Sequence, residues 1–170
     1  MVGLLFVLLF AAVYNTYAQI APMAQMAQMS VGFSAIYNSP RLLEPGETLI
    51  YNKVITNVGG AYNPSTGIMT CPLSGLYVIN VGGLSTPGNL MTLNLYHNGK
   101  YLITVHAYDE SAHSSGSRTV VIECLRGETV YVVVTHPVHM YSGETNNYEH
   151  NIFSGFMISS TMENMVAPMQ

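Results

Sequence analysis

Residues 59 to 78 read GGAYNPSTGIMTCPLSGLYV, a stretch in which two clusters of turn residues enclose a short apolar segment. Between Asn63 and Gly67 the chain has Pro where a turn fixes φ and Gly where a turn needs a positive φ, so the backbone is expected to reverse there. A second cluster of turn residues runs from Cys71 to Gly75, and the segment from Leu76 to Val81 is rich in β-branched and aromatic residues. The stretch therefore predicts a strand, a tight corner and another strand.

The chain after residue 31 repeats this pattern of short apolar or alternating runs separated by turn residues. Asn98-Gly99 stands between two such runs and is the strongest short hairpin signal in the chain. The segment from Ser111 to Arg118 is rich in serine and is predicted to be a loop. We expect no helix in this part of the chain. Short strands broken by turns about every ten residues predict an all-β sandwich or a closed β architecture.

Composition narrows the function classes. The chain has 170 residues, which is the length of about one domain. Only 8% of the residues are charged, against about 25% in ordinary soluble domains, and twelve are tyrosines. Five Lys and Arg residues and a formal net charge of -4 leave no basic stripe to neutralise phosphates, so nucleic acid is not an expected partner.

The two ends of the chain differ in composition from the rest. Residues 1–18 hold an apolar run too short to span a bilayer and end in small residues, which predicts a cleaved secretory signal peptide. We therefore expect an extracellular protein with no membrane span in its mature chain. Residues 19–30 are rich in methionine and are interpreted as a linker, and residues 161–170 as a frayed tail.

Taken together, the spaced motifs also resemble a known family. Tyr62-Asn-Pro-x-Thr-Gly67, followed by Thr70-Cys-Pro-x-x-Gly75-x-Tyr77, resembles the central signature of the globular head domain of complement C1q, a family that includes adiponectin and the cerebellins. The resemblance covers about residues 31–160. It implies a ten-stranded jelly-roll sandwich, as in the tumour necrosis factor fold, and assembly as a homotrimer. The sequence holds no Gly-x-y repeat and so lacks the collagen stalk of complement C1q itself.

The resemblance also implies which residues build the family core. These are Phe33, Tyr62, Gly67, Gly75, Tyr77, Gly127, Phe153, Gly155 and Phe156. Two cysteines are too few for a disulfide scaffold. In a jelly roll, the strand that follows Cys71 would begin near the end of the strand that carries Cys124. A Cys71–Cys124 disulfide and two buried thiols therefore stay open as alternatives.

No pattern in the chain points to catalysis. The sequence has no Gly-x-Ser-x-Gly elbow, no His-Glu-x-x-His and no phosphate-binding loop, so we expect a protein that is not an enzyme and that requires no cofactor. Asp109 and Glu110 are the best candidates for calcium, because carboxylates are scarce here; a solvated acidic turn is the alternative.

The hypotheses about function rest on the family resemblance and not on any one motif. The leading hypothesis is a secreted, lectin-like recognition protein that binds microbial surface glycans or lipopolysaccharide as a homotrimer. The alternatives are an extracellular ligand of a cell-surface receptor and a structural component of a secreted matrix. Loops carry recognition on rigid β scaffolds, so the candidate ligand-binding residues are taken from loops at one end of the sandwich. They are Tyr108, Asp109, His113, Tyr141 and Asn147.

Overall fold

The computed structural model describes residues 30–141 and 149–161. The predicted signal peptide, nearly all of the predicted linker and tail, and the candidate ligand residue Asn147 lie outside these residues. Within the described part every regular element is a β-strand, and all paired strands are antiparallel. No helix in this part is long and apolar enough to cross a membrane.

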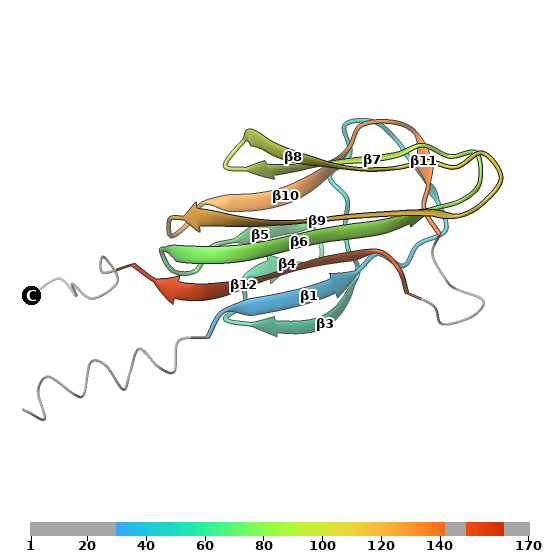
Figure 1. The fold of residues 1–170 in the computed structure, drawn as a ribbon. Coiled ribbons are helices and arrows are strands. Elements are labelled where there is room, and N and C mark those ends of the chain that lie inside the picture. The colour runs from blue at the N-terminus through green and yellow to red at the C-terminus, as the bar shows by residue number, and fades with distance from the viewer. Residues whose placement is uncertain (1–29, 142–148, 162–170) are drawn as a thin grey trace, which may run out of the picture. The chain divides into compact units, whose positions relative to one another are not determined.

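Ten of the strands form two five-stranded sheets that pack face to face, which confirms the predicted all-β jelly roll (Figure 1). The first sheet has the strand order β3 (Lys53–Val58), β1 (Gly32–Ile36), β12 (Ile152–Ser160), β6 (Gly75–Ser85) and β9 (Ser114–Cys124). The second has the order β4 (Tyr62–Asn63), β5 (Ile68–Thr70), β10 (Thr129–Val134), β7 (Met91–His97) and β8 (Lys100–Ala107). A small separate pair joins β2 (Leu42–Leu43) and β11 (Val138–His139).

The core lies between the two sheets and follows the period-2 alternation of the strands. On β6, the residues Tyr77, Ile79 and Val81 are buried, and the residues between them are less so. Aromatic rings fill one part of the core. The Phe33 ring stacks on Tyr62 with centroids 5.0 Å apart and meets the Phe153 ring edge-on at 4.9 Å. The aromatic residues at 33, 62, 77 and 153 that the resemblance assigned to the core are all buried.

Phe156, which the resemblance also assigned to the core, is instead 54% exposed. Phe153 and Gly155 face the core, so the alternation of β12 turns Phe156 to the outer face of the first sheet. Two strand residues that are three positions apart cannot both point inward without a bulge between them, and the bulge of β12 comes later, between Met157 and Ser159. The prediction of a core role for Phe156 is therefore wrong.

Turn chemistry at two sites follows the sequence. Gly67 has φ of +76°, and a Cβ atom there would lie 2.6 Å from the carbonyl oxygen of Leu49, so both backbone angle and space require glycine. Asn98 and Gly99 have φ of 48° and 78° and join β7 to β8, as expected for a type I′ hairpin.

The segment from Ser111 to Arg118 differs from the sequence prediction, because β9 already begins at Ser114. Its first residues pair with the end of β6, where Ser115 lies opposite Leu84. Gly116 allows β9 to pass close to β8, since a Cβ atom at this position would lie 2.6 Å from the carbonyl oxygen of His106. Pairing with a partner strand thus overrides the loop-like local composition.

A disulfide joins Cys71 to Cys124, with their Cα atoms 6.4 Å apart. Cys124 ends β9 of the first sheet, and Cys71 directly follows β5 of the second, so the bond ties the two sheets together at one end of the sandwich. Both residues are completely buried. The backbone around the bond is also fixed, because Cys71 accepts a hydrogen bond from the Gly127 N–H at 2.8 Å and donates one to the Glu128 carbonyl at 2.9 Å.

Tyr62 stabilises the backbone of Tyr51 through its side chain. Its hydroxyl donates to the Tyr51 carbonyl oxygen at 3.1 Å and accepts from the Tyr51 N–H at 3.0 Å. Burial raises the pKa of Tyr62 to about 12, so the hydroxyl keeps its proton at neutral pH. The hydroxyl of Tyr51 itself is buried and has no hydrogen-bond partner among the described residues.

Replacing either tyrosine by phenylalanine removes one hydroxyl, but the two replacements are expected to change the free energy of unfolding differently. Tyr62→Phe is expected to lower the free energy of unfolding by roughly 1–3 kcal/mol, because it leaves the buried N–H and carbonyl of Tyr51 without a partner. Tyr51→Phe removes an unpaired buried hydroxyl and is expected to leave stability unchanged or to raise it. Urea unfolding of both variants measures the difference, and equal losses would contradict the assigned role of the Tyr62 hydroxyl.

Candidate functional site

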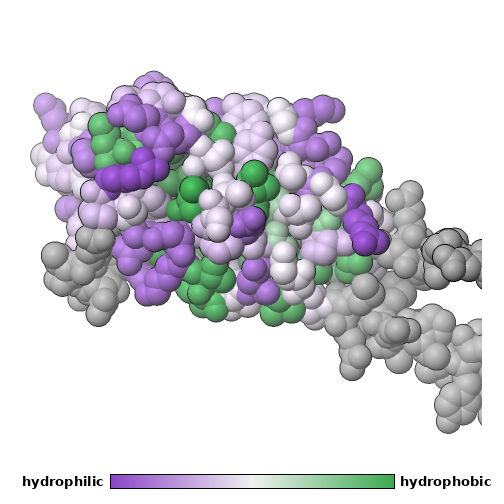
Figure 2. All heavy atoms as spheres, turned by 180° about the vertical axis from the view of Figure 1, so that it is seen from behind, coloured by the Kyte–Doolittle hydropathy of each residue, from purple (hydrophilic) through white to green (hydrophobic). Residues whose placement is uncertain are grey.

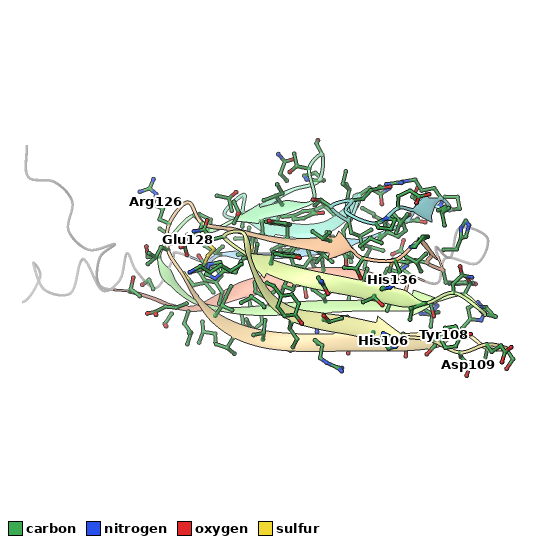
Figure 3. All side chains as sticks on the ribbon, turned by 90° about the horizontal axis from the view of Figure 1, so that it is seen from above. His106, Tyr108, Asp109, Arg126, Glu128 and His136 are labelled. Atoms are coloured by element: carbon green, nitrogen blue, oxygen red, sulfur yellow. A yellow bond between two sulfur atoms is a disulfide. The ribbon has the colours of Figure 1, made fainter. Side chains whose placement is uncertain are left out.

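The candidate ligand residues that the structure describes lie at one end of the sandwich, in the loop after β8 and beside β11. Tyr108 and Asp109 lie in the β8–β9 loop, at the end of the domain opposite to Arg126 and Glu128 (Figure 3). His113 and Tyr141 are in contact, with ring centroids 5.0 Å apart and planes nearly perpendicular. The His150 ring contacts the same tyrosine at 5.4 Å, which the sequence pattern did not suggest.

Asp109 organises the turn in which it lies. One carboxylate oxygen, Oδ1, accepts hydrogen bonds from the Ser111 N–H at 2.9 Å and the Ala112 N–H at 2.8 Å. These backbone donors lower the pKa of the Asp109 carboxyl. The Asp109 carbonyl accepts from the Gly88 N–H at 2.9 Å, so the turn is also fixed to the neighbouring β6–β7 loop. The geometry is that of a structural turn.

Calcium would need more oxygen ligands than this turn supplies, since the ion takes roughly six to eight. Glu110 is exposed beside Asp109. Among the described residues, no third His, Cys, Asp or Glu groups with this pair at metal-binding distance. The hypothesis that Asp109 and Glu110 bind calcium therefore stays a prediction.

The opposite end of the domain has a polar cluster around Glu128. Its Oε2 atom lies 2.9 Å from His97 Nε2 and accepts from the Leu125 N–H at 2.9 Å, while Oε1 accepts from Asn98 Nδ2 at 3.2 Å. The backbone donor of Leu125, followed by His97, lowers the pKa of the Glu128 carboxyl. Cys124 lies within reach of a shared metal ion, but its sulfur is bonded to Cys71 and is not a thiolate. The hydrogen bonds of Glu128 connect the β7–β8 hairpin turn to the turn between β9 and β10, so the cluster is best explained as structural.

On the outer face of the first sheet, a row of apolar residues crosses all five strands. The strand register places five residues side by side, and we refer to them as the apolar row: Val58, Gly32, Phe156, Val78 and Val121. Three of them are about half exposed: Val58 at 50%, Phe156 at 54% and Val121 at 53%. Figure 2 shows the molecule from behind the view of Figure 1, and on that side the hydrophobic residues lie in small groups among weakly polar ones.

The next row on the same face is polar but uncharged. It consists of Thr56, Ser34, Ser154, Asn80 and Thr119. Asn80 Nδ2 donates to Thr119 Oγ1 at 2.9 Å across the two strands. Neither row contains an ionisable side chain. Interfaces between subunits typically deplete charge at their centres, so these two rows have the composition of the centre of a contact surface.

Comparison with known proteins identifies the family of the domain. The model of the C1q domain matches residues 32–158, which is most of the chain. The chain belongs to the C1q-domain family. This C1q domain is 30% identical over 126 residues to a complement C1q subcomponent of Mus musculus, covering 74% of the chain and 49% of the relative. It is 27% identical over 129 residues to complement C1q tumor necrosis factor-related protein 7 of the same species, covering 76% and 43%.

The chain thus spans about half the length of these curated relatives. Among solved structures, the C1q domain resembles the globular domain of the zebrafish complement 1qA protein, with a TM-score of 0.66, 18% identity, and coverage of 77% of this chain and 99% of that one. It also resembles the Eiger TNF of S. frugiperda, with a TM-score of 0.57, 11% identity, and coverage of 83% and 98%. At these identities the likeness shows a shared fold alone.

Proposed function

We propose that this chain is a secreted, non-enzymatic recognition protein whose C1q domain forms a homotrimer and binds glycans on microbial surfaces. The observation that supports the proposal most is the apolar row, because Phe156, Val58 and Val121 are each about half exposed in a single chain. Exposed apolar side chains that are aligned in one row are typical of a protein–protein contact surface, and the family resemblance implies such a contact in a trimer.

The apolar row has the parts expected of a subunit interface. Phe156 is its central aromatic side chain, and Gly32, which lies opposite it on β1, has no side chain that could cover the ring. Aromatic side chains at the centre of an interface usually contribute most of its binding energy. A cyclic trimer contains the same contact three times, so any stabilisation that the apolar row provides occurs three times in the assembly.

Trimer assembly suits recognition of repeated surface glycans. Each subunit would contribute one copy of the loop end that carries His113 and Tyr141. Three weak sites on one particle gain strength by avidity when the target is repetitive, as a cell wall is. The scarcity of Lys and Arg, five in the whole chain, favours ligands whose recognition does not depend on phosphate groups.

The disulfide supports secretion. Cys71 and Cys124 are bonded in the core, and such bonds persist mainly in oxidising compartments outside the cytosol. This observation agrees with the signal peptide predicted for residues 1–18 from the sequence. Both lines of argument favour a folded domain outside the cell.

A binding experiment on the purified protein tests the proposal. Residues 19–170 are expected to elute with the mass of a trimer and to be retained on immobilised mannan, peptidoglycan or lipopolysaccharide, with release by the soluble competing glycan. Repeating the experiment with chelator tests the calcium prediction. A trimer that none of the three surfaces retains would overturn glycan recognition and favour a receptor ligand, while insoluble higher assemblies would favour a matrix component.

A further inference from the structure

Three adjacent strands of the second sheet place three tyrosines side by side on its outer face. The register sets Tyr131 of β10 opposite Tyr96 of β7, and Tyr96 opposite Tyr101 of β8, and we call these residues the tyrosine row. Their neighbours Val130, Val132 and Leu95 face the core, so the tyrosines point away from it. β8, β7 and β10 run next to one another in Figure 1.

The rings of the tyrosine row hold one another in place. The Tyr96 and Tyr131 rings are parallel within 8°, with centroids 5.6 Å apart, and the Tyr101 ring meets Tyr96 at 76° with centroids 6.2 Å apart. These separations are those of favourable aromatic pairs. Tyr101 is 55% exposed. Tyr96 and Tyr131 are partly buried. Because the three rings lie outside the core, the fold does not need them to be aromatic, and together they form a rigid aromatic surface with Tyr101 as its most exposed ring.

A hydrogen-bond chain of defined direction borders the rings. Thr104 Oγ1 donates to Asn94 Oδ1 at 2.7 Å, and the Tyr101 hydroxyl lies 2.9 Å from Thr104 Oγ1. Threonine has one hydroxyl proton, so Tyr101 must be the donor in its contact with Thr104. The Asn94 amide nitrogen, which has no hydrogen-bond partner among the described residues, presents free donors. The lone pairs of the Tyr101 oxygen present an acceptor nearby.

The charge of this surface limits what it can bind. The outward residues of β10, β7 and β8 form three cross-strand rows, which contain no carboxylate and no ammonium or guanidinium group. Their only side chain able to carry positive charge is His106. Lys100, the first residue of β8, pairs with His97 and lies outside these rows. Nucleobases also stack on aromatic rings, but nucleic acid brings phosphates that need several cations. A neutral ligand with one apolar face and neighbouring hydroxyl groups fits best.

We propose that the tyrosine row, with Asn94 and Thr104, is a binding surface for neutral polysaccharide. The C–H face of a pyranose ring packs on the tyrosine rings, and neighbouring hydroxyls of the sugar accept from the Asn94 amide and donate to the Tyr101 oxygen. This inference rests on the proposed glycan recognition and moves its site from the loop end to the outer face of the second sheet.

Two equally exposed tyrosines provide the test. Tyr101 is 55% exposed and belongs to the tyrosine row, whereas Tyr108 is 52% exposed and lies in the loop after β8. The probes are soluble mannan and dextran, as neutral polysaccharides, with alginate as a polyanion, and the readout is the dissociation constant from affinity electrophoresis of the trimer. Tyr101→Ala is expected to weaken mannan or dextran binding by about tenfold or more, the loss expected for one aromatic contact. Tyr108→Ala tests the competing site in the loop after β8, and a ligand on the tyrosine row predicts that this variant binds as the wild type does.

A second pair of variants tests the hydrogen-bond chain without removing a ring. Thr104→Val keeps the shape of the side chain but breaks the link to Asn94, and it is expected to weaken binding several-fold. Thr92→Val on the same face is its control, because Thr92 lies outside this chain of bonds.

The outcomes separate this inference from the proposed function. Loss of binding in Tyr101→Ala and Thr104→Val, with Tyr108→Ala and Thr92→Val unchanged, supports the tyrosine row. Wild-type binding that survives Tyr101→Ala, or that is lost in Tyr108→Ala instead, overturns the tyrosine row and keeps glycan recognition at another site. A wild-type protein that binds alginate alone, or that is retained only on peptidoglycan or lipopolysaccharide, overturns the tyrosine row and keeps glycan recognition. A wild-type protein that binds none of these polysaccharides and is retained on none of these surfaces overturns both.

Discussion

Breaking the Cys71–Cys124 disulfide is expected to lower the free energy of unfolding by about 4 kcal/mol. The bond closes a segment with a sequence separation of 53 residues, and a cross-link of that length removes much of the conformational freedom of the unfolded chain. A domain of this size is usually stable by roughly 5–15 kcal/mol, so the loss would be a large part of the total. Urea unfolding of the protein with and without reductant measures it.

The comparison needs a control that separates the cross-link from packing. Both cysteines are completely buried, so Cys71→Ala with Cys124→Ala also removes two sulfur atoms from the core. Reduced wild-type protein keeps those atoms and loses only the bond. We expect the reduced protein to lose most of the roughly 4 kcal/mol predicted for the cross-link, and the alanine variant to show no response to reductant. A change below about 1 kcal/mol on reduction would contradict this role of the disulfide.

The position of the bond explains why the sequence left it open. Two cysteines in a chain allow one pairing, but whether they meet depends on where β9 ends relative to the start of β6. In the structure Cys124 lies opposite Gly75, and Gly75 follows Cys71 by only a few residues in the sequence. This register is set by eleven residue pairs between β6 and β9, none of which a local pattern reveals.

Features that depend on neighbouring residues were predicted well. The turn at Gly67 and the hairpin at Asn98-Gly99 follow from residues that tolerate positive φ, whatever the rest of the chain does. The alternation of buried and exposed residues along the strands also follows from the sequence, and it predicts the β-sandwich. Had it been applied to β12, it would have placed Phe156 outside, because Phe153 and Gly155 already face inward.

Features that depend on partner strands were not predicted. The serine-rich start of β9 becomes a strand only because β6 extends far enough to pair with it. The tyrosine row brings together residues 96, 101 and 131, and only the combined register of β10, β7 and β8 shows that they are neighbours. For His113 and Tyr141 the sequence analysis predicted the same end of the sandwich, but not the contact between their rings. Candidate site residues are therefore harder to predict than the fold.

Phe156→Asp is expected to convert the proposed trimer into a folded monomer. Phe156 lies in the middle of the apolar row, between Gly32 and Val78. A carboxylate there would be desolvated on assembly, and the symmetry of a trimer would repeat the cost at three contacts. Loss of the central aromatic side chain adds about 2 kcal/mol or more at each contact. Light scattering coupled to size exclusion measures the mass, and far-ultraviolet circular dichroism checks that the sheets remain.

Tyr101→Asp is the matched control, because the two side chains are equally exposed, 55% for Tyr101 and 54% for Phe156, but lie on opposite sheets. If the first sheet is the interface, the control stays trimeric, since its charge remains in water. Wild-type mass in Phe156→Asp, or monomers in both variants, would show that the apolar row is not the contact surface. Because Phe156 does not fill the core, its conversion to aspartate should leave the monomer folded, and any loss of avidity for a polysaccharide then reports assembly itself.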